Sequence, residues 1–170
     1  MSTRRPATDL VTEVLDDFRR IVQVLRSSSR AAEQCVGLSG AQLFVLKALS
    51  AEHPLSMNEL AARTRTHQST VSVVVKRLVA SKLVRTAVSN VDARRVALSP
   101  TAAGLARLKR APLAAQEQLV AGLERMPLAD RRALARCMRH LVQEMQLDEH
   151  PATMFFEERR PVARKARRDV

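Results

Sequence analysis

The stretch that decides the fold is T-H-Q-S-T-V-S-V-V-V-K-R-L-V-A-S-K-L, residues 66–83. Wound as a helix, it places Val71, Val74, Val75 and Leu78 on one side, because residues three and four apart share a face. The opposite side carries small hydroxyls, a valine and two cations without a carboxylate, which suits the base edges and phosphates of a DNA groove. The segment S-V-S-V-V-V also alternates as a strand does, and many surface helices carry two cations. By itself the stretch leaves these three interpretations open.

The side chains expected to contact DNA from this helix, called the recognition face below, are Ser69, Thr70, Ser72, Val73, Lys76 and Arg77. The hydroxyls can donate to or accept from base edges and phosphates, and the valine can touch a thymine methyl group. The lysine and the arginine stand where a phosphate or a guanine could be reached. These six positions are therefore the first candidate DNA-binding residues.

Composition predicts an aliphatic, mainly helical domain. The chain has 170 residues, enough for a hydrophobic core, and 46% of them are hydrophobic but only 2% aromatic. Four glycines are few for the many tight turns of a β-sandwich or barrel. The core is therefore expected to consist of packed helices rich in Leu, Val and Ala.

The net charge of +12 favours a polyanionic partner, either nucleic acid or an anionic membrane. Basic residues are frequent in 156–170, but residues 56–99 also hold eight cations against two carboxylates. No apolar run reaches the roughly 18 residues of a membrane span, and the N-terminus lacks the apolar core of a signal peptide. We therefore expect a cytoplasmic protein. Charge alone leaves both polyanions open; with the motifs below, the expected partner is double-stranded DNA and not a membrane.

Four helices are predicted, a long one and three short ones, and the last of them is the opening stretch. A long amphipathic helix starts at Asp9 and reaches the thirties. Capping boxes at Ser39 and Ser56 each open a short helix. Thr66 is the expected N-cap of the helix that carries the recognition face. Short helices in this order, the last with a hydroxyl-rich start, predict a helix-turn-helix.

A β-hairpin is predicted directly after the recognition helix. Strand-like runs at residues 83–88 and 94–98 flank a turn that contains Asn and Asp. A hairpin in this place is the wing of a winged helix-turn-helix. The predicted fold class is therefore mainly α, with a small β-hairpin wing and helices at both ends of the chain.

The C-terminal half is predicted to be helical. Ser99 is the expected cap of a helix with Pro100 in its first turn, Pro112 should interrupt that helix, and a last helix should begin near Leu128. The domain boundaries that follow are a disordered arm 1–8, a helical dimerisation domain 9–36 with 105–147, a winged helix-turn-helix DNA-binding domain 38–104, and a basic tail 151–170.

The sequence of the predicted wing is its most specific part. Residues 92–104 read D-A-R-R-V-A-L-S-P-T-A-A-G. This run resembles the wing signature of the MarR family of bacterial winged-helix transcription regulators, an Asp and an Arg two apart followed by Leu-Thr-x-x-Gly. The matching positions are Asp92, Arg94, Thr101 and Gly104. Pro100 stands where the family usually has Leu, and Thr86 where it often has Arg, so some wing charge is missing. The resemblance extends over roughly residues 10–146.

The resemblance implies a sequence-specific DNA-binding transcription regulator, a repressor released by a small ligand or an oxidant. Arg94 and Arg95 would approach the minor groove, where a narrow groove concentrates negative potential. Asp92 would position the wing by holding an arginine such as Arg94, although an ordinary turn aspartate remains the alternative. In the family, inducers are often small aromatic or phenolic anions bound between the dimer helices and the winged domain.

Apolar stripes on the first helix and the last two predict a homodimer. One winged helix reads only a few base pairs, so specificity calls for two copies about one turn of DNA apart on a pseudo-palindromic site. Pairing the terminal helices around a two-fold axis would bury their stripes. The alternative is that these helices pack on one another within a single chain.

No chemistry beyond DNA binding is predicted. Cys35 is a candidate redox sensor, but an unreactive, half-buried thiol is the stronger expectation, and Cys137 is expected in the core or on a helix flank. The histidines have no metal-site spacing, and a phosphate-binding loop or a nucleophile beside a base is missing, so we expect no cofactor, no metal and no enzyme. Two other functions stay open: a non-specific DNA-architectural protein, and a membrane-surface protein held by the tail and Met154-Phe155-Phe156.

Overall fold

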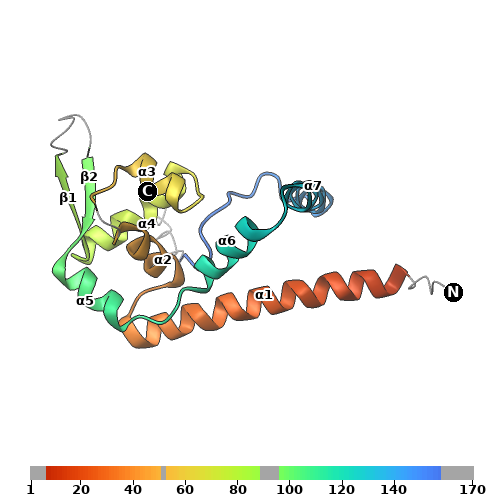
Figure 1. The fold of residues 1–170 in the computed structure, drawn as a ribbon, viewed down its shortest axis with the longest axis horizontal. Helices are drawn as coiled ribbons and strands as arrows, with labels where there is room; N and C mark the ends of the chain where they lie inside the picture. Colours follow the sequence, from red (N-terminus) through yellow and green to blue (C-terminus); the bar gives the residue numbers. More distant parts are fainter. Residues whose placement is uncertain (1–6, 51–52, 89–95, 158–170) are drawn as a thin grey trace, which may run out of the picture.

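The computed structural model describes residues 7–50, 53–88 and 96–157. It contains, in chain order, α1 (Ala7–Val36), α2 (Gly40–Leu49), α3 (Met57–Arg63), α4 (Gln68–Ala80), β1 (Val84–Val88), β2 (Val96–Pro100), α5 (Ala102–Arg110), α6 (Ala115–Arg125) and α7 (Leu128–Glu144). Helices α2 to α5 and the hairpin β1–β2 form one lobe, called the winged lobe here, at one end of the long helix α1 (Figure 1). The predicted fold class, a mainly helical winged helix-turn-helix, is confirmed.

The two predicted capping boxes are confirmed. The backbone amide of Gln42 donates to the Ser39 hydroxyl at 3.3 Å, and the amide of Ser39 donates to the Gln42 side chain at 3.0 Å. Ser56 and Glu59 make the same reciprocal pair at the start of α3, at 3.3 and 2.7 Å. Both boxes satisfy amides that the first turn of a helix leaves without partners, which fixes where α2 and α3 begin.

The predicted N-cap of α4 is wrong by one residue. His67 occupies that position, and its side chain makes no capping hydrogen bond. Thr66 instead belongs to the turn that ends α3, because its amide donates to the carbonyl of Ala61 at 3.0 Å. Its hydroxyl oxygen lies 2.9 Å from that of buried Thr64. A threonine already engaged in one turn cannot cap the next helix.

The hairpin pairs antiparallel from Val84 opposite Pro100 to Val88 opposite Val96. The prediction that Ser99 caps α5 is therefore wrong, since Ser99 and Pro100 both lie in β2. The cap is Thr101, whose hydroxyl accepts from the amide of Gly104 at 3.1 Å and donates to a carbonyl in the turn before β1 at 2.8 Å. The intervening turn, with Asp92, Arg94 and Arg95, lies outside the described residues.

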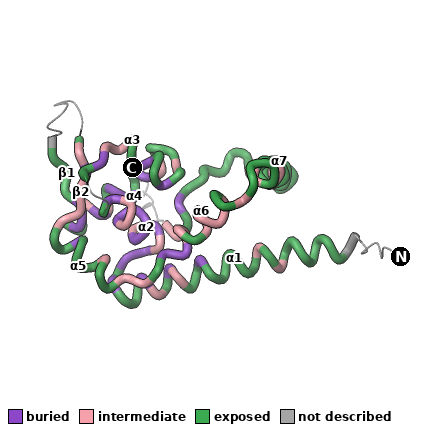
Figure 2. Tube along the Cα trace, viewed as in Figure 1, coloured by how far each residue is buried: buried purple, intermediate pink, exposed green. Residues whose placement is uncertain are grey.

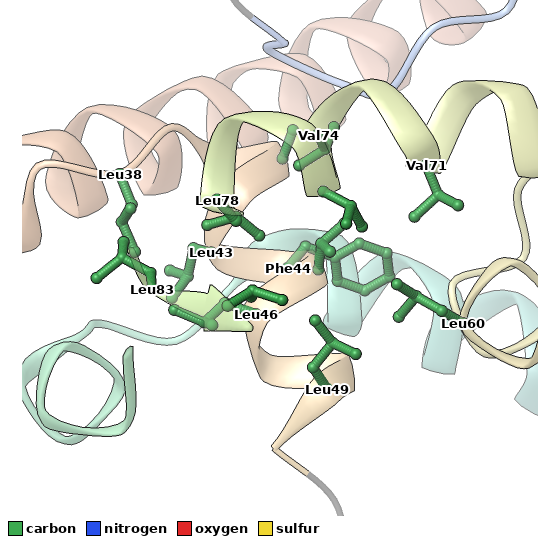
Figure 3. Packing of buried hydrophobic residues seen from close by; sticks show 14 of the residues in the cluster. Leu38, Leu43, Phe44, Leu46, Leu49, Leu60, Val71, Val74, Leu78 and Leu83 are labelled. Carbon is green, nitrogen blue, oxygen red and sulfur yellow. The ribbon is translucent and has the colours of Figure 1, made fainter. Parts of the chain in front are cut away.

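The core of the winged lobe is aliphatic, as the composition predicted. The inner face of α4 packs against α2 and the end of α3, with Val71, Val74 and Leu78 fully buried (Figure 3). Leu55 joins the hairpin to this core, because its amide and carbonyl both bond to Leu98 of β2, at 3.0 and 2.7 Å. Burying aliphatic side chains on α4 from several elements sets its rotation, so its opposite face must point outward.

The helices outside the winged lobe are largely exposed. Helix α5 ends at Arg110 and α6 begins at Ala115, which confirms the predicted interruption at Pro112. Ser28 of α1 holds this corner: its hydroxyl donates to the carbonyl of Leu113 and accepts from the amide of Ala115, both at 3.0 Å. Helix α7 begins at the predicted position, and the structure, which describes all of α7, gives it no buried residue (Figure 2).

Candidate nucleic-acid interface

Helix α4 presents three of the six recognition-face side chains freely outward. Ser69 and Lys76 are exposed, and Val73 is 42% exposed, which is high for a valine on a helix whose other face is fully buried. Among the described residues, no carboxylate forms an ion pair with Lys76. A hydroxyl, a methyl-bearing side chain and an ammonium group on consecutive turns can meet base edges, a thymine methyl and phosphates.

Ser72 lies at one edge of this face. Its hydroxyl donates to the carbonyl of Ser69, one turn earlier, at 2.8 Å. Serine often bonds to its own helix backbone in this way, which leaves its oxygen lone pairs available to a donor. Ser72 is half-buried, so it is placed to accept from a base amino group or from a ligand beside α4.

Thr70 and Arg77 lie on the other edge, seven residues and thus about two helical turns apart. Both contact residues 152–157, called the anchor segment here. The Thr70 hydroxyl donates to the carbonyl of Ala152 at 3.3 Å, and Arg77 Nη1 lies 4.0 Å from Glu157 Oε1. The structure therefore brings the six predicted residues together on one helix but gives two of them partners within the chain.

The anchor segment is a feature that sequence reasoning missed. Met154 is only 4% exposed and belongs to the core of the winged lobe. The signal was present in the apolar run Met154-Phe155-Phe156, which was interpreted from the sequence only as a membrane contact. A side chain buried in the protein core cannot also insert into a lipid surface, so the structure removes one member of that run.

A groove also follows α4 on the Ser72 side. It lies between the start of α3, α4 and the hairpin and has a volume of about 700 Å³. Val75, Val79 and Leu98 form its apolar part, and Ser72 and Lys76 stand at its polar edge. This volume falls within the range of about 300–1,000 Å³ typical of small-molecule sites. We call it the α4–wing groove; no local sequence pattern predicts it.

Little space remains at the junction between α1 and the winged lobe. A cavity there has a volume of about 10 Å³ and is lined by Leu25, Leu43, Ala114 and the two phenylalanines of the anchor segment. This is room for about one water molecule. In the single chain, the place where the family resemblance puts an inducer is therefore filled by the protein's own side chains.

Both cysteines are exposed, which corrects the expectation of a half-buried Cys35 and, for Cys137, excludes the core but not the helix flank. Cys35, in the last turn of α1, was expected to be half-buried, and Cys137, on α7, was expected in the core or on a helix flank. Ala32 and Val36 carry the buried side of α1 at this point, and Cys35 faces away from it. Cys137 lies on α7, all of whose described residues are at least partly exposed.

The described elements define a winged helix-turn-helix fold. The sequence model of the MarR family matches residues 36–95, which run from the end of α1 to the turn of the hairpin. This part of the chain is similar to the MarR family. Members of this family are regulators rather than enzymes; they bind DNA and small-molecule ligands, commonly as dimers.

Solved structures share this fold over most of the chain. A probable transcriptional regulator from Pseudomonas aeruginosa is 25% identical, with a TM-score of 0.52, over 78% of this chain and 98% of its own. The regulator BldR from Sulfolobus solfataricus is 23% identical, with a TM-score of 0.52, over 82% and 99%. A MepR-like protein complexed with pseudoligands is 23% identical, with a TM-score of 0.52, over 79% and 95%. A search of curated sequences gave no match.

Among the described helices, none is long and apolar enough to cross a bilayer.

Proposed function

We propose that this protein is a transcription regulator, a repressor, that binds a pseudo-palindromic DNA site as a homodimer and is released by a small ligand or an oxidant. The observation that carries the proposal is the orientation of α4. Val71, Val74 and Leu78 are buried completely, so Ser69, Val73 and Lys76 face outward as one polar and basic surface. A helix fixed in this way can enter a major groove while its buried side chains stay packed in the core.

Two half-sites require two recognition helices, and the uncovered stripes supply a means of pairing. On α7, Leu134, Met138 and Leu141 are each 37–38% exposed. On α1, Val11 and Leu15 are 61% and 46% exposed. Stripes of this kind along two whole helices exceed what monomeric proteins usually leave in water, and a second copy around a two-fold axis would cover both.

The dimer is tested by placing charge on the α7 stripe. Met138→Glu with Leu141→Glu should raise the dimer dissociation constant at least ~100-fold, because two carboxylates would have to be buried without partners. Arg136→Gln with Arg139→Gln changes the net charge by the same amount on the opposite side of α7 and should leave the dimer intact. Sedimentation equilibrium measures both. Equal dissociation constants for the two double variants would place the dimer contact elsewhere.

The wing is expected to add a minor-groove contact. Arg94→Ala should weaken DNA binding about 10-fold without altering the melting temperature, since a groove contact contributes roughly 1–3 kcal/mol and an arginine in a hairpin turn adds little to folding. Fluorescence anisotropy with labelled duplex DNA measures the affinity, and circular dichroism checks the fold. An unchanged affinity would remove Arg94 from the DNA-binding residues.

The inducer is proposed to be a small aromatic anion bound in the α4–wing groove. The groove offers apolar surface from Val75 and Val79 to an aromatic ring and the Lys76 ammonium to an anionic group. A ligand there would lie against the helix and hairpin that face the DNA. Cys35, being exposed, is the candidate for an oxidant instead.

The function is tested with labelled DNA from upstream of the protein's own gene and a scrambled duplex of equal length. A regulator should bind the upstream duplex at least ~1,000-fold more tightly at physiological salt. Equal affinities would contradict the proposal and favour a non-specific architectural protein. Aromatic carboxylates and an oxidant are then added to the bound complex, with Cys35→Ser separating the two routes of release.

A further inference from the structure

The anchor segment, residues 152–157, lies on the flank of α4 that faces away from the α4–wing groove. After α7 the chain returns to the winged lobe, where it meets α4 (Figure 1). The hydroxyl of Thr70, near the start of α4, donates to the carbonyl of Ala152 at 3.3 Å. Arg77 Nη1 lies 4.0 Å from Glu157 Oε1. The segment therefore contacts α4 at two points, about two helical turns apart.

These contacts engage two side chains of the recognition face within the chain. The Thr70 hydroxyl has one hydrogen to donate, and the carbonyl of Ala152 accepts it. The side chain of Arg77 is only 28% exposed and the carboxylate beside it 9%, so salt and water screen this pair less than a surface pair. With the segment in place, only the outward line of α4 through Ser69 and Lys76 is open to DNA.

The dimensions of a major groove make this flank of α4 important. An α-helix with its side chains is about 10–12 Å across, and the major groove is about 12 Å wide and 8.5 Å deep. A helix that reaches the base edges therefore fills the groove, and its flanks lie against the two phosphate backbones. No room remains there for a further stretch of chain, and the Glu157 carboxylate would meet phosphates of its own sign.

The anchor segment combines a buried side chain with a strained backbone. Met154 is 4% exposed and belongs to the core of the winged lobe. Phe156 has a φ of 56°, a left-handed conformation that bulky residues rarely adopt. Strain of this kind persists only while the surrounding contacts hold it. Burial of Met154 thus opposes the strain at Phe156, which lowers the free energy needed to detach the segment.

We propose that the anchor segment is autoinhibitory: in its place on α4 it withholds Thr70 and Arg77 from DNA, and its detachment gives a second state that binds DNA more tightly. The inference rests on the proposed DNA binding and adds a regulatory step to it. DNA and the segment compete for the same two side chains. Whatever detaches the segment therefore raises the affinity for DNA, and bound DNA weakens the contact of the segment with α4 to the same extent.

The first test removes the charge of Glu157. Glu157→Gln should raise the affinity for the upstream duplex about 3- to 10-fold, because a larger fraction of molecules then offers Arg77 to DNA. Glu149→Gln makes the same charge change at an exposed position and should raise the affinity less than about 2-fold. Fluorescence anisotropy at one salt concentration compares the two variants. Equal affinities, or a lower affinity in Glu157→Gln, would contradict autoinhibition, the second because Glu157 would then position Arg77 for DNA.

A double-mutant cycle separates the anchor segment from net charge. In a background with Arg77→Gln, Glu157→Gln should raise the affinity no more than Glu149→Gln does, because the side chain that it would set free is absent. A gain of the same size with and without Arg77 would mean that Glu157 only repels DNA, and the inference would fail.

Detachment is followed with a tryptophan, since the chain contains none. Phe155 is 49% exposed, so Phe155→Trp can accommodate the larger ring. Adding the upstream duplex should shift its emission maximum to longer wavelength as the ring enters water; an unshifted maximum in the bound complex would show that the segment stays in place and would overturn the inference. Met154→Ser should cause the same shift without DNA and raise the affinity about 10-fold. Circular dichroism checks its fold, and if it unfolds, the cycle at Glu157 decides.

The proposed function and this inference fail in different ways. If the intact chain binds the upstream duplex no more tightly than the scrambled one, the proposed function is removed. If the intact chain discriminates between the duplexes but Glu157→Gln brings no gain, the function stands and the autoinhibitory contact is removed.

Discussion

Gly104→Ala is expected to destabilise the protein by about 2–3 kcal/mol, one of the larger effects available from adding a single methyl group. A Cβ atom at this position would lie 2.3 Å from the carbonyl oxygen of Leu83 and 3.4 Å from Leu46. The nearer atom belongs to the backbone and accepts a hydrogen bond from the amide of Thr101 at 2.9 Å. Helix α5 would have to move away from the core, and that bond would lengthen.

The measurement is urea unfolding followed by circular dichroism, with a matched substitution in another helix. Gly122→Ala lies inside α6, where a Cβ atom meets nothing within 4 Å. It should stabilise the protein by about 0.5–1 kcal/mol, because alanine is the better helix former. If Gly104→Ala unfolds at the same urea concentration as the parent, α5 is not seated on Leu83 as described.

The same glycine shows how much of the fold could be predicted from sequence. Gly104 and Thr101 are recognisable from the wing signature, and the caps at Ser39 and Ser56 from local spacing. Each of these features depends on residues within four positions of one another, so one stretch of sequence contains all the information. The inner face of α4 was predictable for the same reason, since helical periodicity is a local property.

The predicted helix caps were wrong where a residue could form either of two local structures. Contacts in the tertiary structure determine which of the two forms. Thr66 could cap α4 or close the turn after α3, and the second is realised. Ser99 could start a helix or extend a strand, and pairing with Arg85 across the hairpin keeps it in β2. Local sequence signals are equal in such cases, and contacts made elsewhere in the chain decide between them.

The sequence predicted which helix carries the candidate site, but not which of its residues have partners within the chain. All six residues of the recognition face lie on α4, but the partners of Thr70 and Arg77 come from residues 152 and 157, about eighty positions away in the chain. The exposure of Cys137 could not be predicted for a similar reason. The amphipathic sequence of α7 shows that the helix has an apolar face, but not whether that face packs against the same chain or a second copy. Long-range packing of this kind leaves no local signal.

These contacts divide α4 into three parts with different tasks. Its core-facing side sets the helix in place, the Ser72 side borders the α4–wing groove, and the Thr70 side supports the anchor segment. Only the narrow line through Ser69, Val73 and Lys76 is left without partners among the described residues. Base readout is therefore expected to depend on very few side chains. Substituting any one of them should lower the affinity for DNA more than is usual for a residue of its type.

Lys76→Glu should consequently lower the affinity for upstream DNA about 10- to 100-fold, or roughly 1.4–2.8 kcal/mol. The change removes a contact to a phosphate or a guanine and puts a carboxylate next to the DNA backbone. Folding should be unaffected, since the side chain is exposed and no described carboxylate pairs with it.

Lys109→Glu is the matched control, because it makes the same charge change at an exposed position in the last turn of α5. Lys109→Glu should lower the affinity only about 2- to 3-fold. The changed charge lies outside the expected contact surface, and salt screens its field within about 10 Å. Anisotropy titrations at one salt concentration compare the two variants directly. Equal losses would mean that Lys76 acts only through net charge, and α4 would not be the element that enters the groove.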